Sequence, residues 1–214
     1  MKPSGILGGT FDPVHHGHLR LAIEMAETLD LDEVRLVPLY LPPHREPPTA
    51  PAALRLRMLD AAIADTPFLT LDDRELRRAR VSYTVETLAE LRGDLPGRPL
   101  CLILGMDAFA GFEGWQRWRE IIGLAHVAVA KRPGSTLSPS GPIQDVLQHH
   151  GVTDPADLHR REAGCVLIRD VPALDISASA IRARIAAGRS PRHLLPDAVL
   201  DLIERNSLYR ETAK

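Results

Sequence analysis

Six short apolar runs alternate along the chain with longer segments in which apolar residues recur at helical spacing. The runs lie at residues 5–7, 34–39, 68–71, 100–104, 126–130 and 166–168. A run such as LCLIL at 100–104 barely alternates between apolar and polar residues, which is typical of a strand buried on both faces. Helical spacing is found at residues 19–29, 52–64, 85–91, 118–124, 143–149 and 181–187. Repeated strand–helix units predict an α/β fold, a doubly wound parallel sheet with helices on both faces.

Sheets of this kind bind ligands at the carboxyl ends of their strands, near the point where the strand order reverses. A Pro-rich segment, residues 40–51 (YLPPHREPPTAP), follows the second expected strand and should overhang that edge. A second segment rich in Pro, Gly and Ser, residues 132–142, follows the fifth. Neither is long enough to indicate a linker between domains. The 214 residues are therefore expected to form a single domain.

The formal net charge is −2, which argues against a basic nucleic-acid-binding surface but leaves room for a local phosphate site. No uninterrupted apolar run reaches membrane-spanning length. The start of the chain, MKPSGILGGTF, lacks the apolar stretch of a secretory signal. We therefore expect a cytoplasmic protein with neither a nucleic-acid nor a membrane partner. The sequence does not predict the oligomeric state.

The segment richest in chemistry is GGTFDPVHHGH at residues 8–18, between the first expected strand and the first expected helix. Its two leading glycines allow the backbone to turn tightly and to approach a ligand closely. A helix that begins near His16 or Gly17 presents free N–H groups and a positive dipole end, which together form an anion site. His15 and His18 lie three residues apart and face the same side of that helix. Two imidazoles there can bind phosphate oxygens and, where one is protonated, offset the charge of a phosphoryl-transfer transition state.

The histidines of this segment have simpler explanations when they are taken one at a time. A lone histidine at a helix start is more often a cap or a surface residue. A histidine cluster can also bind a transition metal. However, HHGH lacks the i, i+4 pair of the zinc helix motif, and no nearby Cys or Glu completes a ligand set. No metal site is predicted, and the combination with GGTFDP favours a phosphate site.

A second candidate anion site lies at residues 175–182 (DISASAIR), before another expected helix. Ser177 or Ser179 can cap that helix, whose free N–H groups would again attract an anion. Arg182, one turn further on, can reach back to a phosphate with its planar guanidinium group. An ordinary serine-capped helix would explain the same residues.

GGTFDPVHHGH resembles the signature of the HxGH nucleotidyltransferase superfamily, and in its full form it is similar to bacterial nicotinate-nucleotide adenylyltransferases. This resemblance implies a Rossmann-like sheet in which His15 and His18 bind the phosphates of ATP and stabilise the transition state. The backbone that lines the nucleotide site would be that of Gly8, Gly9, Thr10 and Phe11.

The second segment resembles the ISSTxIR motif of the same family, which holds the ATP phosphates. The likeness implies contacts with ATP from Ser177, Ser179, Ile181 and Arg182. Two positions depart from the motif, because Ala178 replaces a serine and Ser179 replaces a threonine. The hydroxyl group survives at 179, whereas a possible donor is lost at 178. The residues expected to be catalytic are His15, His18 and Arg182.

Four further segments extend the resemblance over nearly the whole chain. Gly105 and Asp107 match a GxD element whose carboxylate accepts hydrogen bonds from ribose hydroxyls, although Asp107 could equally be a helix N-cap. On the acceptor side, the resemblance assigns phosphate binding to Arg45, contact with the nicotinate carboxylate to Tyr83 and Thr84, and ring stacking to Trp115. Arg45 could also be a solvated loop residue, Thr84 a plain N-cap, and Trp118 is expected in the core.

The resemblance implies that AMP is transferred from ATP to nicotinate mononucleotide, giving nicotinate adenine dinucleotide (deamido-NAD) and pyrophosphate in NAD biosynthesis. Mg²⁺ is expected to accompany ATP. Pantetheine-phosphate adenylyltransferases look similar, but they are shorter and usually carry Thr at the position of His15. Cytidylyltransferases have a different second motif, and class I aminoacyl-tRNA synthetases have a KMSKS-like segment that is missing here. A non-catalytic nucleotide sensor on the same fold is the alternative of a different class.

Overall fold

A computed structural model describes residues 1–43, 46–132, 141–172 and 174–210. Within these residues, seven strands form one sheet in the order β3-β2-β1-β4-β5-β7-β6, and every neighbouring pair is parallel. The strands are β1 (Ser4–Gly9), β2 (Glu33–Pro38), β3 (Leu69–Leu71), β4 (Leu100–Gly105), β5 (His126–Lys131), β6 (Gly151–Val152) and β7 (Val166–Asp170).

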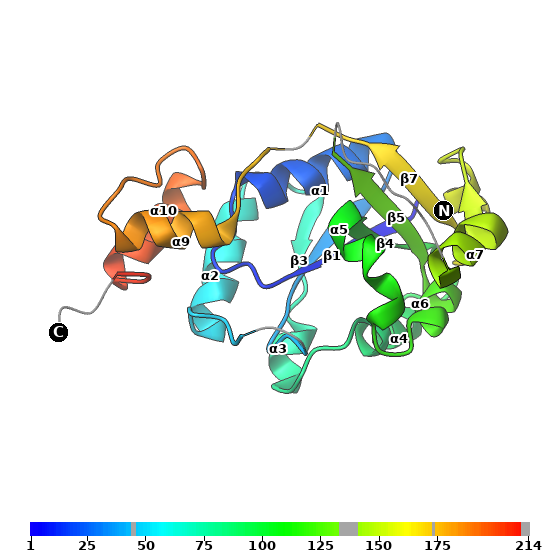
Figure 1. Cartoon of the computed structure of the whole chain (residues 1–214), viewed down its shortest axis with the longest axis horizontal. Helices are drawn as coiled ribbons and strands as arrows, with labels where there is room; N and C mark the ends of the chain where they lie inside the picture. The colour runs from blue at the N-terminus through cyan, green and yellow to red at the C-terminus, as the bar shows by residue number, and fades with distance from the viewer. Residues whose placement is uncertain (44–45, 133–140, 173, 211–214) are drawn as a thin grey trace.

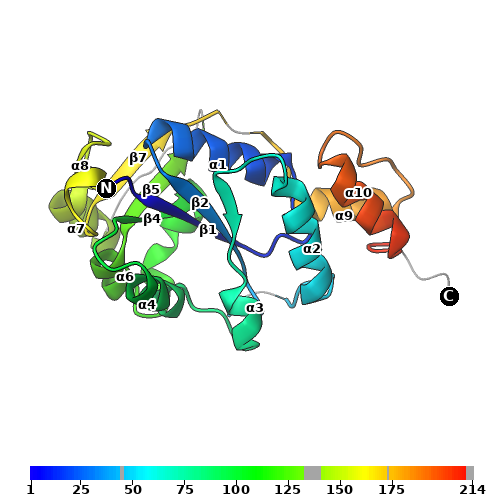
Figure 2. The ribbon, with the colours of Figure 1, turned by 180° about the vertical axis from the view of Figure 1, so that it is seen from behind.

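Helices cover both faces of this sheet (Figure 1, Figure 2). They are α1 (His16–Thr28), α2 (Ala52–Ile63), α3 (Arg74–Arg78), α4 (Thr84–Asp94), α5 (Met106–Ala110), α6 (Trp118–Leu124), α7 (Gly141–His150), α8 (Asp157–Arg160), α9 (Ala178–Ala186) and α10 (Asp197–Arg205), with a 3₁₀ turn at Phe112–Gly114. The predicted doubly wound α/β fold is confirmed. The strand β6 and the helices α3, α5 and α8 were not predicted. Elements of two to five residues are too short to show a periodic pattern of apolar residues.

The central strands contribute to two separate cores, because successive side chains of a strand point to opposite faces. Ile6 packs with the α4, α5 and α6 side of the molecule, whereas its neighbour Leu7 packs with the α1 and α2 side. Leu102 and Ile103 on β4 divide in the same way. Burial on both faces explains why these runs are continuously apolar in the sequence.

The strand order reverses between β1 and β4, which lie side by side in the middle of the sheet. After β7 the chain leaves the sheet, and α9 and α10 lie beyond α2 at one end of the molecule (Figure 1). There α10 packs against α2. This return of the chain brings the second motif to the beginning of α1. No helix in the described part of the chain is long and apolar enough to cross a bilayer.

Candidate active site

A cavity of about 610 Å³ lies at the carboxyl ends of β1, β4 and β5, next to the reversal of strand order. The Pro-rich segment forms one wall through Pro42 and residues 46–49, as predicted. The predicted site residues that line the cavity are Gly9, Thr10, Phe11, His15, His18, Gly105, Ser177, Ser179 and Arg182. The structure therefore brings both predicted phosphate motifs to a single cavity. Arg45 lies outside the described residues.

His15 and His18 face each other across the first turn of α1, which begins at His16 as predicted. Their rings stack with centroids 3.7 Å apart, and Phe11 packs with its ring against that of His18 at 5.0 Å. Burial lowers the pKa of His15 to about 4 and that of His18 to about 3, and the neighbouring imidazoles contribute in the same direction. Both rings are therefore neutral at pH 7 in the substrate-free site, and each offers one N–H donor.

The Nδ1 atoms of His15 and His18 have no hydrogen-bond partner in the described part of the chain. Buried polar atoms are almost always paired in folded proteins. Two such atoms on stacked rings at the start of a helix indicate a site built to receive hydrogen-bonding groups from a ligand.

The stability of the substrate-free protein is expected to fall as the pH drops below about 6.5. The unfolded chain binds protons at the ordinary histidine pKa, whereas the folded chain resists protonation of His15 until about pH 4 and of His18 until about pH 3. Each ring should therefore lower the free energy of unfolding by about 1 kcal/mol per pH unit in that window. Urea unfolding of the wild type and of His18→Asn between pH 7.5 and 5 measures this, and parallel curves would contradict it.

Gly17 keeps His15 in place because it leaves room for its ring. A Cβ atom at this position would lie 3.0 Å from Cε1 and Nδ1 of His15 and 3.3 Å from the carbonyl oxygen of Ile176. Both distances are shorter than ordinary van der Waals contacts. A side chain at residue 17 would therefore displace either the first motif or the second.

Gly17→Ala is expected to lower kcat/KM at least about tenfold, because a misplaced His15 loses its hydrogen-bond geometry. Its stability should change little, since the helical preference of Ala over Gly, worth about 1 kcal/mol, opposes the crowding. Gly93→Ala on α4 is the matched control, because a Cβ atom there meets nothing within 4 Å. Steady-state kinetics and thermal unfolding of both variants test the prediction, and wild-type activity of Gly17→Ala would refute it.

The second motif is held at the cavity by one cap and one buried side chain. The hydroxyl group of Ser177 caps α9 by accepting a hydrogen bond from the amide of Ala180 at 3.2 Å, as predicted for one of the two serines. Ile181 is fully buried in the core and anchors the helix. From the next position, Nη1 of Arg182 donates to the main-chain oxygen of Asp12 at 2.7 Å. The two motifs are therefore in direct contact.

Three predicted residues of the ATP side and the ring-stacking position lie outside the cavity lining. Gly8 is exposed near the end of β1, and Ile181 lies in the core behind the cavity. Asp107 is exposed in the first turn of α5, whose N-cap is Gly105, so the alternative of an N-cap at Asp107 is wrong. Trp115 is half-buried against Phe112, with ring centroids 5.5 Å apart.

Trp118 packs on the same phenylalanine as Trp115, at 5.9 Å, and it is partly buried against the core as expected. The guanidinium of Arg119 covers its ring at 4.4 Å. The structure therefore places both tryptophans in one aromatic cluster beside the 3₁₀ turn rather than in the cavity lining.

The segment around Tyr83 and Thr84 is attached to the Pro-rich segment. The amide of Ser82 donates to the carbonyl of Leu41 at 2.9 Å, and the amide of Tyr40 donates to the hydroxyl of Ser82 at 3.0 Å. Tyr83 is the N-cap residue of α4, so the simpler assignment of Thr84 as N-cap is wrong. Tyr83 and Thr84 are both half-buried and lie outside the cavity lining.

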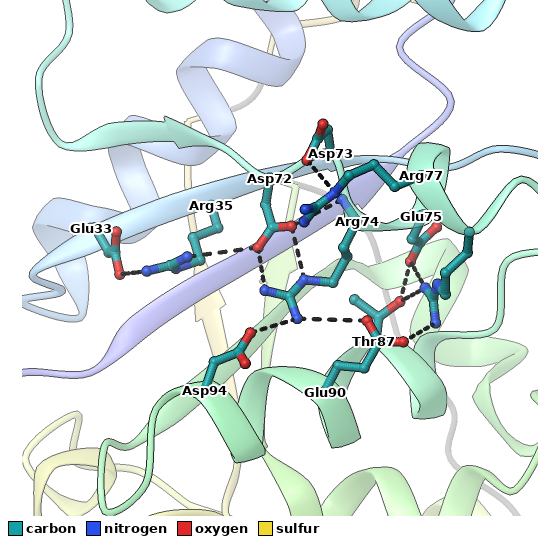
Figure 3. Close-up of polar contacts among 11 residues, drawn as sticks. Glu33, Arg35, Asp72, Asp73, Arg74, Glu75, Arg77, Thr87, Glu90 and Asp94 are labelled. Atoms are coloured by element: carbon teal, nitrogen blue, oxygen red, sulfur yellow. Dashed lines mark hydrogen bonds and ion pairs between the residues drawn. The ribbon is translucent and has the colours of Figure 1, made fainter.

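A cluster of charged residues holds α3 against α4 (Figure 3). The guanidinium of Arg74 forms a two-pronged pair with Asp72, with both distances at 2.8 Å, and also contacts Asp94 at 3.1 Å. Glu75 is buried and accepts a hydrogen bond from the hydroxyl of Thr87. Burial raises the pKa of the Glu75 carboxyl, while hydrogen bonds from Thr87 and Ser82 oppose the shift. These contacts hold α3 and α4 together next to the segment that contains Tyr83.

Sequence reasoning missed three polar residues that are buried next to the cavity, namely Asp12, Arg55 and Tyr209. Asp12 stands inside the first motif and lines the cavity. A signal for Arg55 was present, because it lies three and four residues before Met58 and Leu59 on the apolar stripe of its helix. A charged side chain on such a stripe indicates a buried group with internal partners.

Two helix starts converge on one cavity at the reversal point of a parallel sheet, which is the place where α/β proteins bind nucleotides. The comparisons with known proteins narrow this class to the nucleotidyltransferases. The model of the cytidylyltransferase-like family matches residues 6–184. The chain is 50% identical over 95% of its length to a protein of Marinobacter nauticus, of which it covers 95%, and 46% identical over 96% to one of Methylococcus capsulatus, of which it covers 98%. Both carry the name "Probable nicotinate-nucleotide adenylyltransferase". The chain belongs to the nicotinate-nucleotide adenylyltransferase family.

A solved structure confirms the fold at greater evolutionary distance. The chain superposes on Plasmodium falciparum nicotinic acid mononucleotide adenylyltransferase complexed with NaAD, with a TM-score of 0.75 and 98% of each chain covered. The two sequences are only 15% identical, so this likeness bears on the fold alone.

Proposed function

We propose that this protein transfers the adenylyl group of ATP to nicotinate mononucleotide, releasing pyrophosphate and forming nicotinate adenine dinucleotide. The observation that carries the proposal is the meeting of the stacked His15–His18 pair with Arg182 and the capped start of α9 in one cavity. Donors and a cation from two helix starts surround one space, which suits a polyphosphate. The names of the two relatives described above supply the acceptor.

In the proposed reaction, a phosphate oxygen of the acceptor attacks the α-phosphorus of ATP in line. The new O–P bond forms as the bond to the bridging oxygen breaks, and pyrophosphate leaves. Positioning and electrostatics carry most phosphoryl transfers, so no covalent enzyme intermediate is needed. His15 and His18 donate hydrogen bonds to phosphate oxygens, and the guanidinium of Arg182 offsets the negative charge that builds up on the leaving group.

Mg²⁺ is proposed to enter this site together with ATP. The described residues contain no group of three or more His, Cys, Asp or Glu side chains able to hold a metal ion by themselves. The Asp12 carboxylate in the cavity wall is engaged by the amides of Thr49 and Ala50 and by the hydroxyl group of Tyr209. The ion would therefore be held through the triphosphate, where it neutralises charge.

For the acceptor, the proposal assigns the nicotinate carboxylate to the backbone N–H groups at Tyr83 and Thr84. A carboxylate accepts hydrogen bonds only, whereas a carboxamide also requires an acceptor from the protein. Arg45 is proposed for the acceptor phosphate and Trp115 for the pyridine ring. Because Trp115 packs on Phe112 outside the cavity lining, this last assignment requires the ring to turn or the acceptor to extend beyond the cavity.

The test is pyrophosphate release from ATP and Mg²⁺ with nicotinate mononucleotide, nicotinamide mononucleotide or phosphopantetheine as acceptor. Fast turnover with the nicotinate form and at least about tenfold slower turnover with the others would support the proposal. Equal turnover with both pyridine nucleotides would contradict the role of the Tyr83–Thr84 segment. ATP binding without release under any acceptor would favour a nucleotide sensor.

A further inference from the structure

Arg55 on α2 is the bulkiest fully buried side chain in the described part of the chain, with 1% of its surface exposed. A charge buried this deeply is costly unless its hydrogen bonds are satisfied. Main-chain carbonyls meet that need: Nη1 donates to the oxygens of Thr10 and Leu39, both at 2.8 Å, and Nε donates to that of Ala50 at 3.3 Å. The guanidinium of Arg55 therefore ties together three stretches of backbone.

One of these three carbonyls belongs to a residue that lines the active-site cavity, and the other two flank its Pro-rich wall. Thr10 follows β1 and lines the cavity on the side of the first motif. Leu39 precedes the Pro-rich wall and Ala50 follows its last cavity-lining residue, Thr49. One side chain thus attaches both ends of the Pro-rich wall to the backbone of the first motif.

Asp12 makes a second set of connections between the same parts. Its carboxylate, which is 3% exposed as a residue, accepts from the amides of Thr49 at 2.7 Å and Ala50 at 3.1 Å and from the hydroxyl group of Tyr209 at 2.6 Å. Its main-chain oxygen accepts from Arg182 at 2.7 Å. Asp12 therefore joins the first motif to the Pro-rich wall, to α9 and to the C-terminal segment.

The Asp12 carboxylate opposes the lowering of the Arg55 pKa that burial causes. Burial and the hydrogen bond to Asp12 raise the pKa of Tyr209, so its phenol keeps its proton and remains a donor. Arg55, Asp12 and Tyr209 form one buried polar cluster that reaches the cavity wall at Asp12. Its members come from α2, the first motif and the last described residues of the chain.

We infer that Arg55 and Asp12 are positioning residues for adenylyl transfer, which hold the first motif, the Pro-rich wall and Arg182 in the relative places that the reacting phosphates require. The inference rests on the proposed function for its reaction. Displacement of a catalytic group by about 1 Å can lower a rate about 100-fold. A lysine at 55 keeps the charge but cannot span three carbonyls with one planar fork.

The test compares Arg55→Lys with Arg92→Lys. Arg92 is a matched control because its contacts lie at the edge of the sheet opposite the cavity. Arg92 on α4 also donates to main-chain carbonyls, those of Arg98, Leu124 and Glu162, at 2.6–2.9 Å. These lie where the chain enters β4 and β5 and before β7, at the edge of the sheet opposite the cavity. The two substitutions remove the same kind of contact from opposite edges.

Thermal unfolding, kcat and the KM for ATP are measured for both variants. We expect both to be destabilised, but only Arg55→Lys to lose about 10- to 100-fold in kcat, with a smaller change in KM. Arg92→Lys should stay within about twofold of the wild type in both constants. Equal losses of kcat in the two variants, or a wild-type kcat for Arg55→Lys, would overturn the inference.

Tyr209→Phe provides a milder variant in case Arg55→Lys fails to fold. It removes one hydrogen bond to Asp12 and leaves the ring in place. A reduced kcat at an unchanged fold would support the inference, whereas a wild-type kcat would oppose it. If the wild type releases no pyrophosphate, the proposed function fails. Calorimetric binding of a non-hydrolysable ATP analogue then decides: affinity lowered severalfold in Arg55→Lys and not in Arg92→Lys supports positioning, and equal affinities overturn it.

Discussion

Replacing His18 by alanine is expected to lower kcat for pyrophosphate release about 100- to 1000-fold. The ring of His18 lines the cavity and stacks on that of His15 at 3.7 Å, so its loss removes one hydrogen-bond donor and also frees the other ring to move. Loss of one preorganised donor to a developing negative charge typically costs this much in rate. The KM for ATP should rise much less, because the interaction strengthens in the transition state.

His16→Ala is the matched control for this experiment. His16 lies between the two catalytic candidates in the same helical turn, yet it does not line the cavity. Its amide bond to the carbonyl of Leu194 is formed by the main chain and survives the substitution. We expect His16→Ala to keep kcat within about threefold of the wild type. If both variants lose activity to the same extent, the effect belongs to the helix start and not to the imidazole of His18.

Replacing Arg182 by lysine is expected to lower kcat about 100-fold. The guanidinium of Arg182 lines the cavity while its Nη1 holds the main-chain oxygen of Asp12 at 2.7 Å. A guanidinium can serve that oxygen and a phosphate at the same time through separate N–H groups, whereas an ammonium is a compact point charge without a fixed fork. The charge is conserved in this variant, so a large loss would identify geometry as the contribution of Arg182.

Arg184→Lys is the corresponding control on the same helix. Arg184 is exposed, does not line the cavity, and its guanidinium donates to the carbonyl of Ser190 at 3.1–3.2 Å. Steady-state kinetics should find wild-type constants for this variant. Full activity of Arg182→Lys would mean that a positive charge alone suffices at position 182.

The strands and most of the helices could be predicted because burial on two faces leaves a direct trace in the sequence. LCLIL at 100–104 is apolar throughout because Leu102 and Ile103 enter different cores. The start of α1 was predicted to within one residue, at His16 or Gly17, and the cap of α9 to one of two serines, since local backbone geometry decides both. The short helix α5 was not predicted. It starts at Met106, so Asp107 lies in its first turn and is not its N-cap.

The sequence by itself determined which groups could bind phosphate, because motif chemistry is local: two glycines at a strand end, two histidines one turn apart and a serine-capped helix with an arginine. Only the tertiary structure decided that these segments, about 160 residues apart in the chain, share one cavity. It also decided that Arg55, Asp12 and Tyr209 meet at the wall of that cavity and that Trp115 packs on Phe112 instead of lining it. Such contacts depend on how α2, the aromatic turn and the returning C-terminal segment pack in space, and long-range packing leaves no periodic trace in a single sequence.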